Sequence, residues 1–258
     1  MKILMMGDVT SPAAARYLAG VLPSARRRLA VDLAVVNAEN AGFIIGAAPE
    51  TAQLLLSSGA DVLTGGNHTL QNYAMLAAID AMPRVLRPAN FPGGVAGNGY
   101  YIATARSGAR VLVMSLLGRT HIEPPLGSPF EAADRVLSSA RGRYDVAVVD
   151  FHAEATGEKL ALGHYLDGRV AAVVGTHTHV PTADAQILPR GTGYVTDLGM
   201  CGARDSILGM MPEEIVERYL TAINHKLHPA EGEMKADGIL LTVDEVTGKT
   251  TDFERIVL

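Results

Sequence analysis

The stretch VAAVVGTHTHV, residues 170–180, decides the fold, because an apolar run of strand length ends in a glycine and then delivers two histidines. The run Val170–Val174 is typical of a buried strand, and Gly175 lets the backbone turn where the strand ends. In an extended segment, residues two apart point the same way, so His177 and His179 are expected to face one site. Alone, this pair is open to two interpretations, metal binding or two polar loop residues.

Similar apolar runs recur on both sides of this stretch, and segments with helical spacing separate several of them. Strand, loop, helix and strand in succession predict an α/β fold. The end of the chain differs, because residues 238–243 and 251–257 predict a hairpin with its turn at 247–248. Without a repeat, linker or low-complexity tract, we expect a single domain over residues 1–258. The expected strands are Ile3–Met6, Leu33–Val36, Asp61–Leu63, Val111–Ser115, Val146–Val149 and Val170–Val174. The expected helices are Ala13–Leu22, Pro49–Ser58, Asn72–Ala81 and Pro129–Ala140.

Composition excludes several classes of function. Hydrophobic residues make up 48% of the 258 residues, enough for a large core, and the net charge of -5 argues against a general nucleic-acid binder. Metal ions would still supply local positive charge for a small phosphate ligand. The single cysteine, Cys201, allows no intramolecular disulfide. The apolar runs are too short for a signal peptide or a membrane span, so we expect a cytoplasmic protein.

Polar side chains of three kinds follow five of the expected strands. Each of these strand ends delivers a carboxylate, a carboxamide or an imidazole. Ligand sites of α/β sheets lie at the carboxyl ends of the strands, so these side chains are expected to converge. The residues are Asp8, Glu39, Asn40, Asn67, His68, His152, His177 and His179.

Each of these residues, taken alone, has an ordinary structural interpretation. Short polar side chains cap helices and form turns, and a buried histidine is often simply hydrogen-bonded in a core. Since all of these explanations would have to hold at once, each at a strand end, we favour a shared site. The alternatives are Asp8 as the cap of a helix starting near residue 11 or 12, Glu39 and Asn40 in a turn, Asn67 and His68 as a loop pair, and His152 in the core.

The mixture of donors indicates the metal. The set comprises one Asp, one Glu, two Asn and three His, not counting His68. These donors suit iron, manganese or zinc. They differ from the thiolates of structural zinc sites and from the all-oxygen ligands of calcium sites. Seven ligands are too many for one ion, but they fit two ions bridged by a carboxylate and roughly 3.5–4 Å apart. We expect two divalent ions per chain, iron or manganese, with zinc as the alternative.

Several motifs resemble those of a known superfamily. Gly7-Asp8, residues 37–40 (NAEN), residues 66–68 (GNH), His152 and residues 175–179 (GTHTH) resemble the ordered blocks of the calcineurin-like metallophosphoesterases. The longer runs DFHAEAT (150–156), GTHTHVPTAD (175–184) and TDLGMCG (196–202) resemble the bacterial YmdB-like branch, and the resemblance covers nearly the whole chain. It implies a four-layer sandwich of two mixed β-sheets flanked by helices, and hydrolysis of phosphodiesters such as 2′,3′-cyclic nucleotides and cyclic AMP.

The resemblance also implies roles for individual residues. Glu39 would bridge the two metal ions, and a hydroxide between them would attack phosphorus in line. His68 would be the proton donor to the leaving oxygen. Two positions depart from the pattern: Thr10 replaces the usual histidine of the first block, with Asn40 as the substitute, and Thr69 replaces an aromatic residue. Metal one would be held by Asp8, Asn40 and His179, and metal two by Asn67, His152 and His177.

Some assignments stay open. Arg119 follows an expected strand and would contact either a substrate phosphate oxygen or a surface carboxylate. Glu154 and Asp184 would either orient histidine ligands or cap loops. The expected partner is a small phosphodiester, with no membrane and no strong nucleic-acid binding, and a homo-oligomer is left open. The alternatives to a phosphodiesterase are a phosphomonoesterase or nuclease of the same chemistry, and a slow nucleotide-sensing regulator.

Overall fold

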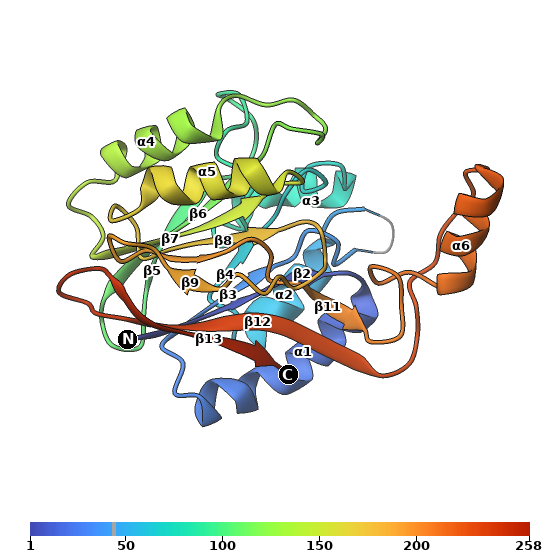
Figure 1. Cartoon of the computed structure of the whole chain (residues 1–258), viewed down its shortest axis with the longest axis horizontal. Coiled ribbons are helices and arrows are strands. Elements are labelled where there is room, and N and C mark those ends of the chain that lie inside the picture. The colour runs from blue at the N-terminus through green and yellow to red at the C-terminus, as the bar shows by residue number, and fades with distance from the viewer. Residues whose placement is uncertain (43–44) are drawn as a thin grey trace.

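Two β-sheets stack face to face, with helices on their outer faces (Figure 1). The computed structural model describes residues 1–42 and 45–258. The first sheet has the order β2-β11-β12-β1-β3-β4, with β13 paired to β12, and the second has the order β5-β6-β7-β8-β10-β9. Both sheets mix parallel and antiparallel neighbours. The predicted four-layer sandwich of two mixed sheets is therefore confirmed.

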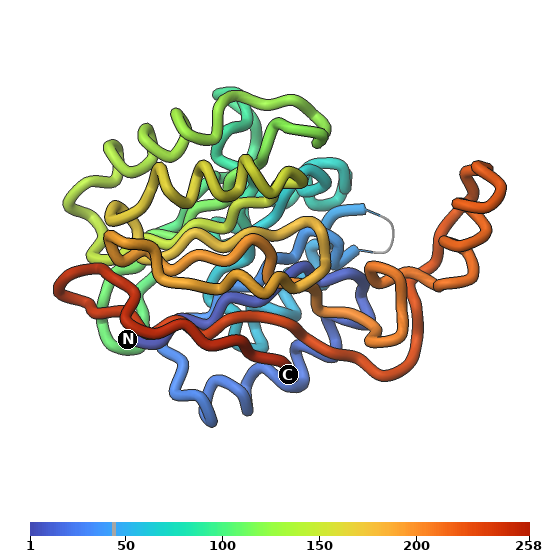
Figure 2. Tube along the Cα trace, viewed as in Figure 1, coloured from blue at the N-terminus to red at the C-terminus, as the bar shows by residue number. Residues whose placement is uncertain are grey.

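The strands of the first sheet come from both halves of the chain. The first and the last but one run side by side in Figure 2, where blue β1 lies against red β12. The predicted terminal hairpin is confirmed as β12 and β13. The strands are β1 (Lys2–Met6), β2 (Asp8–Val9), β3 (Leu33–Asn37), β4 (Val62–Thr64), β11 (Met200–Ala203), β12 (Met234–Val243) and β13 (Thr250–Val257).

The second sheet is built from the middle of the chain. Its central strands β6, β7 and β8 are parallel and almost entirely buried, as expected for strands covered on both faces. The strands are β5 (Tyr100–Thr104), β6 (Arg110–Leu117), β7 (Val146–His152), β8 (Ala172–Thr176), β9 (Gln186–Ile187) and β10 (Gly193–Val195).

Alternation along the strands divides the core into three layers. In β1, Ile3 and Met5 point into the core between the sheets, while Leu4 and Met6 point into the core under α1 and α2. This period of two is the geometry of a strand buried on both faces. A third core lies between the second sheet and α4 with α5. The helices are α1 (Pro12–Arg28), α2 (Pro49–Ser57), α3 (Tyr73–Ala78), α4 (Pro129–Ser139), α5 (Thr156–Leu166) and α6 (Pro212–Thr221).

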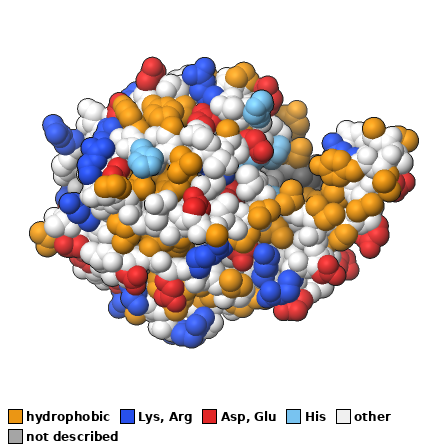
Figure 3. Space-filling view, viewed as in Figure 1, with side chains coloured by type: hydrophobic (Ala, Val, Ile, Leu, Met, Phe, Trp, Pro, Cys, Tyr) orange, Lys and Arg blue, Asp and Glu red, His pale blue; other side chains and the backbone are white. Residues whose placement is uncertain are grey.

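The helices differ from the prediction in a few respects. The segment expected as one helix over Asn72–Ala81 is α3, capped by Asn72, followed by a 3₁₀ turn at Ile79–Ala81. Helix α6 projects from the body and presents hydrophobic side chains on its surface (Figure 3). In the described part of the chain, no helix is both long and apolar enough to cross a membrane.

The register of the parallel strands places their carboxyl ends together. His152 at the end of β7 is opposite Thr176 at the end of β8, and Asn37 at the end of β3 is opposite Thr64 at the end of β4. Asn37 also donates a hydrogen bond to Asp150, at 2.9 Å, so the ends of the two sheets meet. This shared edge carries the candidate site.

Candidate metal centre

Three histidines and an aspartate form the middle of the site. The Oδ1 atom of Asp8 lies 3.6 Å from His152 Nδ1 and 3.8 Å from His179 Nε2. The rings of His152 and His177 pack edge to face, with His177 Nδ1 3.1 Å from His152 Nε2. The structure therefore brings together imidazoles from the ends of β7 and β8 and the carboxylate that begins β2.

The other predicted residues surround this group. Glu39 Oε1 lies 3.9 Å from His152 Nε2, and Asn40 Nδ2 lies 3.5 Å from His179 Nε2. The Glu39 carboxylate also accepts hydrogen bonds from the backbone N–H groups of Gly66 and His68. These bonds tie the loop that carries Asn67 to the site, so all seven expected ligand side chains lie at one edge.

Both carboxylates are buried with too little positive charge around them. Burial raises the pKa of Asp8 to about 7, against the opposing effect of His179. Burial likewise raises the pKa of Glu39 to about 8, although hydrogen bonds from His68 and Gly66 oppose the rise. A charged carboxylate away from water requires a nearby cation. The site is therefore electrostatically suited to bind positive charge.

Two buried oxygens lack hydrogen-bond partners among the described residues. They are Asp8 Oδ1 and Asn67 Oδ1. A buried polar atom without a partner costs about 1–3 kcal/mol, so it usually marks a missing ligand or a functional role. A carboxylate oxygen and an amide oxygen are also two of the donors expected of an iron or manganese site.

The facing nitrogens of His152 and His177, 3.1 Å apart, are spaced like two ligands of one metal ion. His177 Nε2 lies 3.1 Å from Glu154 Oε2. Burial lowers the pKa of His152 well below its usual value and also lowers the pKa of His177, which favours the neutral form that binds metals. Two nitrogens bound to one tetrahedral zinc ion would be roughly 3.3 Å apart, close to the distance between these two.

The side-chain atoms expected to bind metal lie close together, but they are directed at one another. Within residues 1–42 and 45–258, no three His, Cys, Asp or Glu side chains are already arranged as the ligands of one ion. Two of the seven residues are asparagines, and Glu39 is held by hydrogen bonds from Gly66, His68 and Thr69. The donor set fits two ions in composition and position, and binding them would require these side chains to reorient.

Local backbone geometry holds the histidines close. A Cβ atom on Gly66 would overlap the His152 ring, so glycine is needed there for the close approach. His177 and His179 have positive φ angles of 101° and 63°. Non-glycine residues with such angles cost of order 1–3 kcal/mol each and occur most often at functional sites.

His68 and Arg119 lie outside the ligand cluster. His68 Nδ1 is 3.0 Å from Gln71 Oε1, and its Nε2 is 3.3 Å from Asn67 Nδ2. Arg119 is exposed, and its backbone N–H donates to Glu158. Among the described residues its side chain forms no ion pair, and both interpretations of Arg119 stay predictions.

The structure decides the open alternatives for three residues. The cap of α1 is Ser11, whose hydroxyl accepts from the Ala14 N–H at 3.1 Å, so Asp8 is not a helix cap. Glu154 contacts His177, as expected of a group that orients a ligand. Asp184 instead accepts hydrogen bonds from Thr182 and Thr196 and, within the described ranges, has no hydrogen bond or ion pair to a histidine, which is the loop-capping alternative.

The two departures from the superfamily pattern have structural explanations. The Thr10 hydroxyl donates to the Cys201 carbonyl at 3.1 Å, so it is directed away from the site. Asn40, the expected substitute, lies beside His179. The Thr69 hydroxyl donates to Glu39 Oε2 at 3.1 Å, so Thr69 supports the predicted bridging carboxylate.

Sequence reasoning gave no role to a buried polar network beneath the histidines. Its members are a carboxylate, an amide and two hydroxyls, all buried, at the ends of strands from both sheets. Burial raises the pKa of the carboxylate, Asp150, to about 6, although hydrogen bonds from Thr64, Thr176 and Asn37 oppose the rise. The signal was present, because a polar residue inside an apolar strand needs a buried partner. The network consists of Asn37, Thr64, Asp150 and Thr176.

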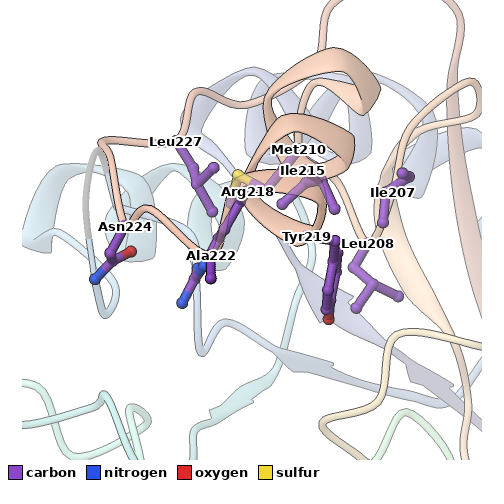
Figure 4. A pocket seen from close by; sticks show the side chains of 9 residues that line it. All are labelled: Ile207, Leu208, Met210, Ile215, Arg218, Tyr219, Ala222, Asn224 and Leu227. Carbon is purple, nitrogen blue, oxygen red and sulfur yellow. The ribbon is translucent and has the colours of Figure 1, made fainter.

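A cavity of about 510 Å³ lies beside the site, between α6 and the loop before it (Figure 4). Its lining is largely apolar, with Met210, Ile215 and Tyr219. No predicted site residue lines it, and the connection to the site is Leu208, whose carbonyl is 3.0 Å from His179 Nδ1. The cavity is therefore separate from the metal-ligand cluster.

The fold and the composition of the site are those of a phosphoesterase of the metallophosphoesterase type. More particularly, the chain belongs to the YmdB-like protein family, whose model matches residues 4–256.

Known proteins resemble the chain along its whole length. A 2′,3′-cyclic-nucleotide 2′-phosphodiesterase of Bacillus subtilis (strain 168) is 42% identical, covering 100% of this chain and 97% of that protein. A crystal structure of a hypothetical protein from Thermus thermophilus matches with a TM-score of 0.92 and 37% identity, covering 100% of this chain and 99% of that chain. The structure of a novel phosphatase from Mycoplasma pneumoniae matches with a TM-score of 0.91 and 31% identity, covering 100% and 93%.

Proposed function

We propose that the chain is a two-metal phosphodiesterase that hydrolyses cyclic nucleotides, with 2′,3′-cyclic nucleotides as the preferred class. The observation that carries the metal assignment is a pair of buried oxygens, Asp8 Oδ1 and Asn67 Oδ1, which have no hydrogen-bond partner among the described residues. They lie at the same edge as the imidazoles of His152, His177 and His179. The name of the Bacillus subtilis relative supports the substrate class. An aspartate, a glutamate, asparagines and histidines are the donors that iron and manganese bind, with zinc as the alternative.

The chain's own residues divide into two ligand groups. Asp8, Asn40 and His179 would hold one ion. Asn67, His152 and His177 would hold the other, and Glu39, which lies within 3.9 Å of His152, would bridge the two. When bound, such a metal pair lowers the pKa of water and neutralises the oxygens of an in-line displacement at phosphorus.

His68 and Arg119 would act on the substrate. The Gln71 side-chain N–H donates to the Asn67 carbonyl, so Gln71 Oε1 faces His68 Nδ1 and holds a hydrogen there. A proton on His68 Nε2 is then the one available to the departing oxygen. Arg119, exposed beyond the end of β6, would contact a phosphate oxygen.

The test is a substrate panel on protein purified without oxygen and analysed for its metal. Rates would be measured with manganese, iron or zinc restored, on 2′,3′- and 3′,5′-cyclic nucleotides, nucleoside monophosphates and an oligonucleotide. We expect about two ions per chain and fastest turnover of the 2′,3′-cyclic nucleotides. Cleavage of the 2′ bond would leave a 3′-monophosphate, which chromatography distinguishes. Protein that binds no metal, or that is inactive on every cyclic nucleotide after metal is restored, would contradict the proposal.

A phosphomonoesterase is the second candidate. It is favoured by the Mycoplasma pneumoniae structure, which is described as a phosphatase. The same panel separates the two, because a monoesterase would release inorganic phosphate from the nucleoside monophosphates and would leave the cyclic nucleotides unchanged.

A further inference from the structure

Asp150 lies buried beneath the histidines, in contacts that the proposed reaction does not use. Its Oδ1 accepts a hydrogen bond from the Thr176 hydroxyl at 2.7 Å. Its Oδ2 accepts from the Asn37 amide at 2.9 Å and from the Thr64 hydroxyl. Thr176 Oγ1 in turn lies 3.0 Å from His152 Nδ1. The carboxylate is thus one hydroxyl away from a predicted metal ligand.

The orientation of the Asn37 amide is fixed by the backbone. Asn37 Oδ1 accepts from the Glu39 N–H at 2.9 Å, so its NH₂ group faces the network. The two hydrogens of that group go to Asp150 Oδ2 and to Thr176 Oγ1, at 2.9 and 3.2 Å. Neither is left for His152 Nδ1, which is 3.5 Å away. His152 therefore does not accept from Asn37.

The Thr176 hydroxyl then decides where His152 carries its hydrogen. The Thr176 hydroxyl accepts from Asn37 and donates its one hydrogen to Asp150 Oδ1, at 2.7 Å. Toward His152, Thr176 Oγ1 can only accept. The hydroxyl therefore favours a hydrogen on Nδ1. Nε2 faces His177 Nδ1 at 3.1 Å, where it accepts a hydrogen from that ring or is left to a metal ion.

We propose that Asp150 and Thr176 are positioning residues that hold His152 in the Nδ1–H tautomer, so that Nε2 is the atom offered to a metal ion. Histidine ligands of metals usually donate their other ring N–H to such a partner, which fixes ring orientation and raises basicity. The metal part of this inference rests on the proposed function, whereas the tautomer is a property of the metal-free protein. Since Asn37 and Thr64 belong to one sheet and Asp150 and Thr176 to the other, the stacking of the sheets sets the position of His152.

The test compares Thr176→Val, which keeps the branched shape, with Thr176→Ser, which keeps the hydroxyl. Long-range ¹H–¹⁵N NMR of the metal-free protein reports which nitrogen of His152 carries the hydrogen. We expect Nδ1–H in the wild type and in Thr176→Ser, and a mixture of tautomers in Thr176→Val. Metal affinity, measured against a chelator, should fall roughly 10- to 100-fold in Thr176→Val and recover in Thr176→Ser.

The matched control is Thr192→Val. Thr192 is as fully buried as Thr176, but it precedes β10 at the other end of the same sheet, where its hydroxyl donates to the Val170 carbonyl at 2.7 Å. This variant should lose stability without changing the His152 tautomer or metal affinity. A wild-type spectrum with the hydrogen on Nε2, which needs no variant to fold, would overturn the proposal, as would an unchanged tautomer in Thr176→Val. If the wild type binds no metal but shows the Nδ1–H tautomer, the proposed function fails and the positioning role stands.

Discussion

The ring nitrogens of His68 face two groups that are not expected metal donors, which separates its expected role from that of the Asn67 oxygen. Its Nδ1 faces Gln71, and its Nε2 lies near the Asn67 amide nitrogen. We predict that His68→Ala retains both metal ions and loses roughly 10²–10⁴-fold in rate on a cyclic nucleotide, the usual contribution of a general acid. The loss on bis(p-nitrophenyl) phosphate should be clearly smaller, because p-nitrophenolate leaves without a proton.

Two controls accompany this His68 variant. His164→Ala removes an exposed histidine of α5 and should change neither rate. Metal content should be measured in each variant. Equal losses on both substrates, or a depleted metal content, would show that His68 is a ligand or a structural residue.

Glu39 and Asn40 are neighbours in sequence, but we expect them to contribute unequally to metal binding and to the rate. Glu39 is buried and would give the metal ions a negative charge when ionised, while Asn40 offers one neutral oxygen and is partly exposed. Glu39→Gln should therefore reduce metal from about two ions per chain toward one or none, and reduce the rate more than Asn40→Ala. Elemental analysis and kcat would be compared with Glu50→Gln, an exposed glutamate on α2. Full occupancy and rate in Glu39→Gln would remove the bridging assignment.

Arg119 has its backbone fixed by Glu158 and its side chain in solvent. If the guanidinium binds a phosphate oxygen, Arg119→Ala should lower kcat/KM about 10- to 100-fold. This loss corresponds to the free energy that a hydrogen bond to a charged group usually contributes. Metal content should not change. Arg141→Ala, at another exposed arginine, is the control. An unchanged kcat/KM would mean that Arg119 has no contact with substrate.

At the scale of elements, α6 differs from the other helices because none of its residues is buried. Tyr219 and Leu220 are 86% and 81% exposed. Val216→Pro should break this helix yet leave the melting temperature of the protein nearly unchanged, because few tertiary contacts are lost. Arg135→Pro, at an exposed position inside α4, should cost about 3 kcal/mol or more. Both would be measured by thermal denaturation, and a large loss in Val216→Pro would show that α6 supports the fold.

The sequence identified the elements whose hydrophobic pattern is strong. The strands β1, β3, β6, β7 and β8 are apolar runs buried on both faces, so composition alone marks them. The edge strands β5 and β9 are partly or fully exposed, and α6 buries nothing, so no pattern distinguishes them from loops. The partners of Asp150 were also beyond prediction from sequence, because Thr64 and Asn37 are 86 and 113 residues away along the chain.

At the scale of the whole molecule, the expected metal ligands come from both sheets, so metal binding should stabilise the stacking of the two. Binding at 100 times the dissociation constant adds about 2.7 kcal/mol, which corresponds to a rise of roughly 5–10 °C in melting temperature for a chain of this size. Calorimetry before and after chelation checks this. A melting temperature that chelation and manganese leave unchanged would contradict a metal site shared by the sheets.

The position of β12 has a consequence for synthesis on the ribosome. β12 lies between β1 and β11 in the first sheet. Along the chain, β1 precedes every other strand of this sheet, whereas its neighbour β12 precedes only β13. Asp8 therefore lacks the neighbours that enclose it until β11 and β12 have been translated. Strand pairings between residues far apart along the chain form slowly. A nascent chain released before Met234 would lack β12, the strand that joins β11 to β1. The expected metal centre would thus be completed late in folding, although Asp8 precedes every other expected ligand along the chain.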